Sequence, residues 1–318
     1  MSIKVVYITG CLGFIGSYVT QRCLDLGWHV RGIDKKTYAS RNDVLNKFLS
    51  YSNFIFENKD INDIEFLYDC DYIINTAAET HVGNSIVNSD DFVRSNIDGV
   101  HNILNLLKNY RQEQKQTPIL IHFSTDEVYG DITEGEHLET DVLKPSNPYS
   151  ATKAAADMLI LAWARTYGIR YNIIRPTNNY GIGQYVEKLL PKTIKFLNLN
   201  RKIPLHNHGT PIRNWLHADD TALAVIKIIE SGNVNQIYNI CGGFEQDNYT
   251  TVSKIIREYH GKDVCIEDYL DLTFSRSGQD VRYALNDTKL RSLNWEPEKI
   301  FDSELLKIID YYKEQFIW

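Results

Sequence analysis

The chain has 318 residues, of which 43% are apolar and 24% charged, an ordinary balance for a folded globular protein. Its 34 basic and 41 acidic residues give a net charge of −7, which argues against nucleic acid or an anionic membrane as the main partner. The longest apolar runs have strand length and none precedes the first strand, so we expect neither a membrane span nor a secretion signal. Five cysteines without a C-x-x-C pair indicate free thiols in a reducing compartment, so we expect a cytoplasmic protein that binds no metal.

The first predicted element is an apolar strand over 5–8, followed by the glycine-rich run TGCLGFIG and a helix. Gly10 permits a tight turn, Gly13 lets the backbone approach a pyrophosphate at the positive helix N-terminus, and Gly16 lets helix and strand pack closely. Many glycine-rich turns bind nothing, but one that lies between a strand and a helix favours a dinucleotide site.

A second strand over 30–33 ends at Asp34, about 20 residues past the glycines, where a carboxylate can accept both ribose hydroxyls of a dinucleotide. The same carboxylate would repel a 2′-phosphate, so the pattern favours NAD over NADP. Two observations leave the alternative open. An aspartate at this point can simply begin a turn, and Lys35, Lys36 and Arg41 are nearby cations.

Further apolar strands are predicted over 54–57, 72–75, 119–123 and 171–175, with a helical pattern over 92–107. Strands and helices thus alternate as a Rossmann-type doubly wound parallel sheet of the α/β class requires. Beyond residue 177 the alternation loosens and lysines and arginines become frequent, which fits a lobe that grips an anion or, for any single lysine, a solvated face. We therefore predict a Rossmann domain over 1–177 and a smaller C-terminal α/β substrate lobe over 178–318, between which the chain can cross.

Polar residues follow the strand over 119–123, at the edge where open α/β sheets bind ligands. They are the run Ser124, Thr125, Asp126 and Glu127. Neighbouring side chains of an ideal strand face opposite ways, so this run must leave strand geometry if both carboxylates are to reach one ligand.

The next helix is predicted to begin with Asn147 as N-cap and Pro148 as first residue. Tyr149 and Lys153 then lie on one helix face, about 6 Å apart along the axis. An ammonium at that distance is expected to lower the phenol pKa from about 10, as a proton-abstracting tyrosine requires.

Together with the glycine pattern, Thr125, Tyr149 and Lys153 make the chain resemble the extended short-chain dehydrogenases/reductases that act on nucleotide sugars. Within that superfamily it is most similar to the dTDP-glucose 4,6-dehydratases and the related UDP-glucose dehydratases. The matching motifs extend over nearly the whole chain: TGCLGFIGS at 9–17, DKKTYA at 34–39, AAETHV at 77–82, STDEVYG at 124–130, PYSATKAAAD at 148–157, NNYG at 178–181, EKLLP at 187–191, RNWL at 213–216, YNI at 238–240 and RSGQDVRY at 276–283. The pair Asp126–Glu127 favours a dehydratase, because epimerases of the superfamily need only the Thr/Ser, Tyr and Lys.

The resemblance implies a mechanism. Tyr149 takes the C4 hydroxyl proton as hydride passes to NAD⁺, Thr125 hydrogen-bonds the reacting oxygen, and Lys153 binds the nicotinamide ribose. Glu127 then removes the C5 proton while protonated Asp126 donates to the departing C6 hydroxyl, and hydride returns to C6. The expected product is a 4-keto-6-deoxy sugar nucleotide, made from dTDP- or UDP-linked glucose or its 2-acetamido analogue, N-acetylglucosamine.

The resemblance also implies the residues that surround the two ligands. Those that bind the cofactor are Gly10, Gly13, Phe14, Ile15, Gly16, Asp34, Asp60, Ile61, Ala77, Ala78, Ser95, Tyr149, Lys153 and Asn179. Those that hold the sugar, diphosphate and base are Thr80, Asn178, Lys188, Leu189, Arg213, Asn248, Arg276 and Gln279. As alternatives, the two neighbouring asparagines can form a turn, and Asn248 can cap a helix. Gly83–Asn84, Tyr185 and Ser277 replace the family's usual Asp-Arg, Phe and Pro, so the substrate stays open.

Other activities remain as alternatives. They are a UDP-N-acetylglucosamine 4,6-dehydratase with 5-epimerase activity, another nucleotide-sugar epimerase or decarboxylase, and a catalytically idle cofactor-binding protein. The acidic pair disfavours the second, and the complete Thr125, Tyr149, Lys153 set disfavours the third. Because relatives of this family commonly pair through two helices per subunit, we expect a homodimer that uses the helices over 92–107 and 151–163.

Overall fold

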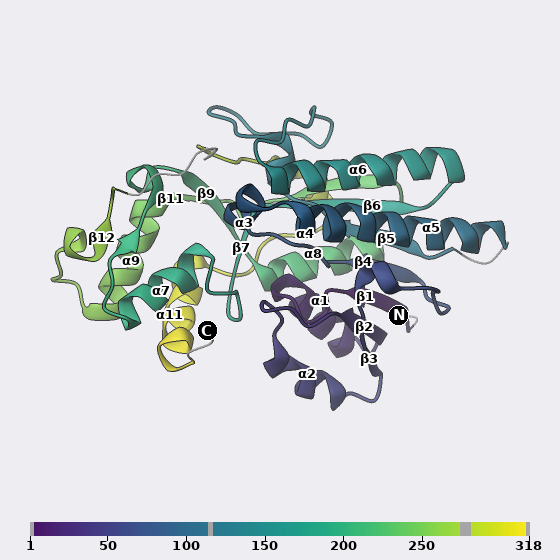
Figure 1. Ribbon diagram of the computed structural model, residues 1–318, viewed down its shortest axis with the longest axis horizontal. Coiled ribbons are helices and arrows are strands. Elements are labelled where there is room, and N and C mark those ends of the chain that lie inside the picture. Colours follow the sequence, from purple (N-terminus) through teal and green to yellow (C-terminus); the bar gives the residue numbers. More distant parts are fainter. Residues whose placement is uncertain (1–2, 114–116, 274–280, 316–318) are drawn as a thin grey trace.

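The structure, a computed structural model, describes residues 3–113, 117–273 and 281–315 (Figure 1). In this part of the chain the main sheet has seven parallel strands in the spatial order β10-β6-β5-β4-β1-β2-β3. They are β1 (Val5–Thr9), β2 (His29–Asp34), β3 (Phe54–Asn58), β4 (Tyr72–Asn75), β5 (Ile119–Phe123), β6 (Tyr171–Pro176) and β10 (Gln236–Ile240). The strand order reverses between β1 and β4, which is where a sheet of this kind opens a crevice for a ligand. The predicted Rossmann-type α/β fold is confirmed, and each of the six predicted strands is present with its ends within one residue.

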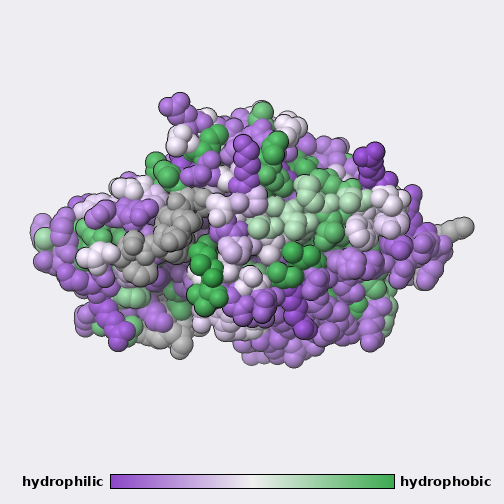
Figure 2. All heavy atoms as spheres, turned by 45° about the horizontal axis from the view of Figure 1, so that its top comes forward, coloured by the Kyte–Doolittle hydropathy of each residue, from purple (hydrophilic) through white to green (hydrophobic). Residues whose placement is uncertain are grey.

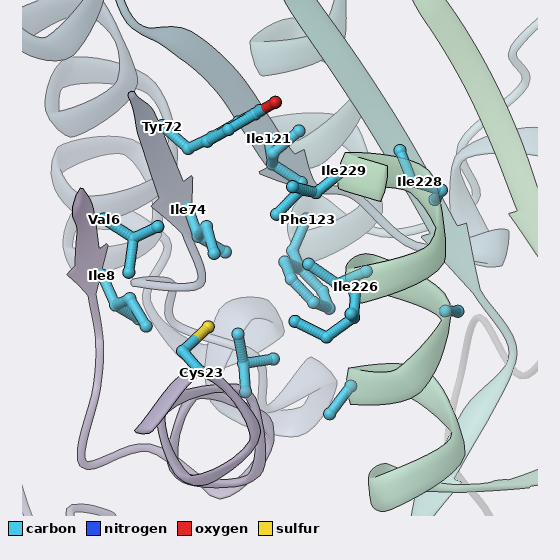
Figure 3. Packing of buried hydrophobic residues seen from close by; sticks show 14 of the residues in the cluster. Val6, Ile8, Cys23, Tyr72, Ile74, Ile121, Phe123, Ile226, Ile228 and Ile229 are labelled. Atoms are coloured by element: carbon cyan, nitrogen blue, oxygen red, sulfur yellow. The ribbon is translucent and has the colours of Figure 1, made fainter. Parts of the chain in front are cut away.

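Helices cover both faces of this sheet, so its central strands are buried on both sides and read as continuous apolar runs. One face packs against α1 (Phe14–Asp25), α2 (Asn42–Leu49) and α8 (Ala218–Ser231), and the other against α5 (Gly99–Gln112) and α6 (Pro148–Tyr167). Figure 3 shows part of the first layer, with strand side chains facing α1 and α8: Val6, Ile8, Ile74, Ile121 and Phe123 against Cys23, Ile226 and Ile229. This packing holds the carboxyl ends of β1, β4 and β5 in a fixed row.

The helix predicted over 92–107 is divided in the structure. It consists of α4 (Asp90–Val93), a π-helical turn η2 (Arg94–Asp98) and then α5. α6 is uninterrupted over 20 residues and begins as predicted, with Asn147 as N-cap in a capping box with Ser150 and with Pro148 in its first turn. It ends at Gly168, whose φ of 66° is the left-handed conformation that glycine tolerates.

A smaller lobe is built from elements that follow β6. Its sheet has the order β11-β9-β7, formed by β7 (Asn178–Tyr180), β9 (Ile212–His217) and β11 (Phe244–Asp247), and β8 (Ile203–Pro204) pairs with β12 (Leu270–Asp271). The helices α7 (Leu189–Asn198), α9 (Asn248–His260) and α11 (Phe301–Glu314) pack around a separate apolar core that includes Ile194, Val252 and Ile308. The short helices α3 (Val82–Val87) and α10 (Thr288–Arg291) complete the α-helices of the described residues.

The chain crosses back from the smaller lobe to the main sheet. α8 packs against α1, and β10 pairs in parallel with β6 from Gln236–Asn172 to Ile240–Pro176. Residues 218–240 therefore belong to the Rossmann layer although they follow residue 178. The domain boundary at residue 177 stays a prediction. The prediction allowed the chain to cross between the lobes, and residues 218–240 make such a crossing. Within the described ranges, no helix combines the length and the apolar character needed to cross a membrane.

Candidate active site

A cleft runs along the carboxyl ends of β1, β2, β4 and β5 and reaches the smaller lobe. It contains about 1530 Å³ of space between protein atoms, its open mouth included. The predicted site residues in its lining are Gly10, Gly13, Phe14, Ile15, Gly16, Asp34, Asp60, Ile61, Ala77, Ala78, Thr80, Ser95, Thr125, Asp126, Glu127, Tyr149, Asn178, Asn179 and Lys188. Residues predicted from nine different stretches of sequence thus face one cavity.

The glycine-rich loop forms one end of the cleft. Gly10 has a φ of 72°, and a Cβ there would lie 2.7 Å from the amide nitrogen of Ala77, so only glycine fits between the loops after β1 and β4. A Cβ on Gly16 would lie 2.0 Å from the carbonyl oxygen of Gly10, which shows how closely α1 packs onto this turn. Gly13 is the N-cap of α1 and offers no side-chain acceptor, and the first turn carries no acidic residue. The first amides of α1 are therefore available to an anion such as a pyrophosphate.

Asp34 lies at the end of β2 with its carboxylate buried. Oδ2 accepts a hydrogen bond from the amide of Leu12 at 3.0 Å, and Oδ1 accepts from the amide of Lys36 at 2.8 Å and from the Ser40 hydroxyl at 2.9 Å. These donors fix the carboxylate at the lining of the cleft, in the place where the ribose of a dinucleotide is expected.

Lys35, Lys36 and Arg41, the cations that kept NADP as an alternative cofactor, each interact with a group other than Asp34. The Lys35 ammonium lies 3.6 Å from the carboxylate of Asp60, and the Arg41 guanidinium lies 3.0 Å from that of Asp43. The Lys36 ammonium lies over the ring of Phe56, 5.2 Å from its centre. Their arrangement around Asp34 favours an unphosphorylated ribose.

The run after β5 leaves strand geometry, as predicted. Thr125 is the extended N-cap of a 3-10 turn, η3 (Asp126–Tyr129), and its hydroxyl accepts a hydrogen bond from the amide of Glu127 at 3.3 Å. The same hydroxyl donates to Oδ1 of Asp126 at 3.0 Å. Both carboxyl groups consequently line the cleft.

The two carboxyl groups have different surroundings. Burial, and then the charge of Glu127, raise the pKa of Asp126 to about 7. Its Oδ2 has no hydrogen-bond partner among the described residues, although it is buried. Glu127 is less buried and accepts a hydrogen bond at 3.1 Å from Nδ2 of Asn147. The pair therefore combines a buried carboxyl group that readily holds a proton with a less buried one that Asn147 holds in place.

Tyr149 and Lys153 are both buried at the start of α6, at 7% and 3% exposure. Burial and the charge of Glu127 raise the pKa of Tyr149, against the hydrogen-bonding contact with Thr125, which lowers it. Lys153 does not line the cleft; it donates to the carbonyl oxygen of Phe123, and burial lowers its pKa to about 8. The prediction that Lys153 lowers the phenol pKa is therefore wrong for this structure. The four-residue spacing does bring Tyr149 and Lys153 to the same part of α6, but the lysine side chain extends toward β5.

The predicted substrate residues divide into three groups. Thr80, Asn178 and Lys188 line the cleft, and Lys188 donates to the carbonyl oxygen of Thr80 at 2.9 Å. Leu189, Arg213 and Asn248 do not line the cleft. Arg276 and Gln279 lie outside the described residues. Asp247 rather than Asn248 is the N-cap of α9, accepting from the amide of Thr250 at 2.7 Å, so the alternative of Asn248 as a cap is wrong.

The comparison with protein families decides the identity of this fold and site. The model described as the NAD dependent epimerase/dehydratase family matches residues 6–241. The chain belongs to this family. The predicted family and the predicted NAD cofactor are confirmed.

Individual relatives of the family match over almost their whole length. The dTDP-glucose 4,6-dehydratase of Haemophilus influenzae is 37% identical over 331 residues, which cover 96% of this chain and 97% of the relative. The low-salt glycan biosynthesis protein Agl12 of Haloferax volcanii is 36% identical over 312 residues, covering 96% and 98%. The crystal structure of DesIV, a dTDP-glucose 4,6-dehydratase from Streptomyces venezuelae with NAD and TYD bound, has a TM-score of 0.91 at 31% identity, covering 98% of this chain and 97% of that one.

The residues of the cleft fit the NAD that the family name implies. The glycine turn leaves room for a pyrophosphate, and Asp34 lies where the ribose hydroxyls of a bound dinucleotide would come. Ala77 and Ala78 keep the cleft open beyond β4. The described residues contain no group of three or more His, Cys, Asp or Glu that could hold a metal ion.

Two buried residues that support this family site were not predicted in that role. Asn96, inside the π-helical turn, exchanges hydrogen bonds with the amide and the carbonyl of Glu79 at 2.9 and 3.0 Å and donates to the Thr152 hydroxyl at 2.9 Å. It thereby ties the loop after β4 to α6 beside Lys153. Asn147, predicted only as a cap, also holds Glu127. The π-helical turn is the structural feature that marks the role of Asn96, and the helical pattern of the sequence does not predict this turn.

Proposed function

We propose that the chain catalyses the NAD-dependent 4,6-dehydration of a nucleoside-diphosphate hexose, with dTDP-glucose as the first substrate to consider. The observation that carries the proposal is the pair Asp126–Glu127 in the same cleft as Thr125 and Tyr149. An epimerase has no use for a protonated carboxyl group beside a second carboxyl group, whereas elimination of water needs an acid and a base. The name of the Haemophilus influenzae relative, which is 37% identical, supports the substrate class.

The first step is oxidation at C4. When bound, NAD⁺ would supply the hydride acceptor for this step and the hydride donor for the later one. Tyr149 removes the proton of the C4 hydroxyl, and Thr125 hydrogen-bonds the same oxygen. Because burial raises the phenol pKa in the structure, we expect that Tyr149 acts as a base only in the loaded site.

The second step is elimination across C5 and C6. The C5 proton is acidic once C4 is a ketone, and Glu127 removes it from a position fixed by Asn147. Asp126 gives its proton to the leaving C6 hydroxyl, for which a pKa near 7 suits it. Elimination leaves a double bond between C5 and C6 and releases water. The hydride taken from C4 would return from the reduced cofactor to C6 while C5 regains a proton, which gives the 4-keto-6-deoxy sugar nucleotide with no net redox change.

The decisive experiment is to incubate the purified protein separately with dTDP-glucose, UDP-glucose and UDP-N-acetylglucosamine and to record product masses. Loss of one water from the glucose nucleotides is the expected result, and the preferred nucleotide identifies the base. Loss of water from UDP-N-acetylglucosamine alone would replace the proposed sugar by its acetamido analogue. Product of unchanged mass would indicate an epimerase, and no turnover of any of them would reject the proposal.

A further inference from the structure

A group of ionisable side chains is buried beneath the cleft. It consists of Lys153 and Asp157 on α6, Arg175 on β6 and His122 on β5, and none of these side chains is more than 3% exposed. Charges in a protein interior are costly unless opposite charges and hydrogen bonds compensate them. Of these four, the mechanism implied by the family resemblance uses only Lys153, so the other three need a separate explanation.

Asp157 is the shared partner in this group. Its Oδ2 accepts hydrogen bonds at 3.0 Å from the Ser124 hydroxyl and from Nε of Arg175, and the terminal guanidinium nitrogen of Arg175 is also 3.0 Å away. Asp157 follows Lys153 by one helical turn, so the two side chains leave the same face of α6. Its charge raises the pKa of Lys153 against the larger lowering by burial.

His122 contributes no charge to the buried group, because its ring is neutral. Its Nδ1 lies 3.0 Å from Nδ2 of Asn75, whose Oδ1 accepts from the Thr9 hydroxyl at 2.6 Å. Asn75 therefore donates to Nδ1, and the ring proton is on Nε2, 4.0 Å from Oδ1 of Asp157. Burial, followed by the charges of Lys153 and Arg175, lowers the pKa of His122. The group consequently contains two cations and one carboxylate.

We propose that Asp157 is a positioning residue that keeps the Lys153 ammonium charged and held at the end of β5. Arg175 and Ser124 fix the carboxylate in the place where it serves the lysine. Ionisable side chains near this group include Tyr149 of α6 and three residues of η3. The latter are Asp126, Glu127 and Tyr129, whose hydroxyl accepts a hydrogen bond from Arg175 at 2.6 Å. All of them are unchanged in the variants below. Without Asp157, two buried cations would lack their counter-charge, and Lys153 would release its proton at lower pH.

The first test follows Lys153 directly and does not depend on the proposed function. Isotopically labelled lysine is incorporated, and the Lys153 resonance is titrated by NMR after assignment by its absence in Lys153→Arg. The parent should titrate near pH 8, Asp157→Asn at a lower pH, and the charge-keeping control Asp157→Glu close to the parent. An unchanged titration in Asp157→Asn would overturn the proposal.

The second test rests on the proposed function and follows cofactor reduction in the first turnover across the pH range. If charged Lys153 is required, the rate falls as pH rises through its pKa, so the fall should move to lower pH in Asp157→Asn. A fall at the parental pH would show that the charge has no part in the reaction. Expected titration in the first test with no turnover of any sugar nucleotide would reject the proposed function and leave the role of Asp157 intact.

Folding of the neutral variant is a separate question with its own test. Asp157→Ser, which leaves room for a water, takes the place of Asp157→Asn if the latter does not fold. If neither folds, each is combined with Lys153→Met, which removes the cation that Asp157 compensates, and separately with Arg175→Met. Recovery of folded protein with Lys153→Met supports the pairing. Recovery with Arg175→Met but not with Lys153→Met contradicts it, because Asp157 would then compensate Arg175 alone.

Discussion

At the scale of single residues, Glu127→Gln separates the two halves of the proposed reaction. C4 oxidation should continue, since Tyr149, Thr125 and Lys153 are untouched, but elimination should slow by about 10²–10⁴, the range typical of a lost general base. Reduced cofactor should then accumulate on the protein and be visible as nicotinamide absorbance. Tyr149→Phe is the matched control, in which the cofactor should stay oxidised. Exchange of the C5 proton at the parental rate in Glu127→Gln would transfer the role of base to another group.

The pKa of Asp126 predicts a pH dependence for the elimination step. Only the protonated form can donate to the leaving hydroxyl, and the pKa is raised to about 7, so elimination should slow as pH rises through 7. Water release measured in single turnovers checks this. Asp126→Asn should be slow at every pH and lack this decline. A decline that persists in Asp126→Asn would assign it to a different residue.

The sequence predicts which residues form the catalytic set, because their spacing on a strand end and a helix start fixes where the backbone carries them. It does not predict their protonation. The difference between Asp126 and Glu127 depends on burial and on Asn147, twenty residues later in the chain. The direction of Lys153 depends on a carbonyl of β5 and on Arg175 of β6, which only the folded sheet brings near.

At the scale of elements, the turn between β1 and α1 predicts an unusual response to alanine. Gly16→Ala lies in a helix with ordinary dihedral angles, where propensity alone would favour alanine by about 1 kcal/mol. Its Cβ would instead meet the Gly10 carbonyl at 2.0 Å, so we expect a loss of about 1–3 kcal/mol and reduced NAD content. Thermal unfolding and cofactor analysis measure both. Gly99→Ala in α5 is the control, since the three atoms nearest to its Cβ belong to the Ile61 side chain and not to the backbone. An equal loss there would refute the explanation.

The end of β2 predicts which cofactor copurifies. Because Asp34 is fixed by three donors and Lys35 and Arg41 are paired with other carboxylates, heat-released cofactor from fresh protein should be NAD. Chromatography against standards identifies it. A preparation that contains mainly NADP would contradict the role given to Asp34.

Elements with a strong local pattern were predictable, and those that depend on distant partners were not. The first six strands are apolar runs between turn residues, and each was found with its predicted bounds or within one residue of them. β10 is equally short, but its partner β6 lies more than fifty residues earlier, and no local pattern shows that it returns to the main sheet. The π-helical turn likewise follows from the tertiary contacts of Asn96 rather than from helix propensity.

At the scale of the whole molecule, an apolar surface over α6 supports the prediction of a homodimer. Figure 2 shows this patch, and the described residues of α6 that contribute to it include Met158, 48% exposed, and the exposed alanines Ala151 and Ala162. Light scattering at micromolar concentration should give the mass of two chains. Met158→Asp should weaken the dimer because it buries a charge at the interface, whereas Ile300→Asp, at a 70% exposed site before α11, should not. A monomeric parent protein would reject the prediction.

The pairing of β10 with β6 also has a consequence for folding during synthesis on the ribosome. Until residues 236–240 have left the exit tunnel, β6 presents an unpaired edge, and α1 lacks the covering helix α8. The Rossmann domain therefore stays incomplete during synthesis of the smaller lobe's first helix and of most of that lobe's own sheet. Vectorial folding of the two halves, one after the other, is excluded by this topology. A gene fragment that stops at residue 177 lacks β10 and should accordingly yield an aggregation-prone chain. Chaperones would bind the edge of β6 that β10 covers in the full-length protein.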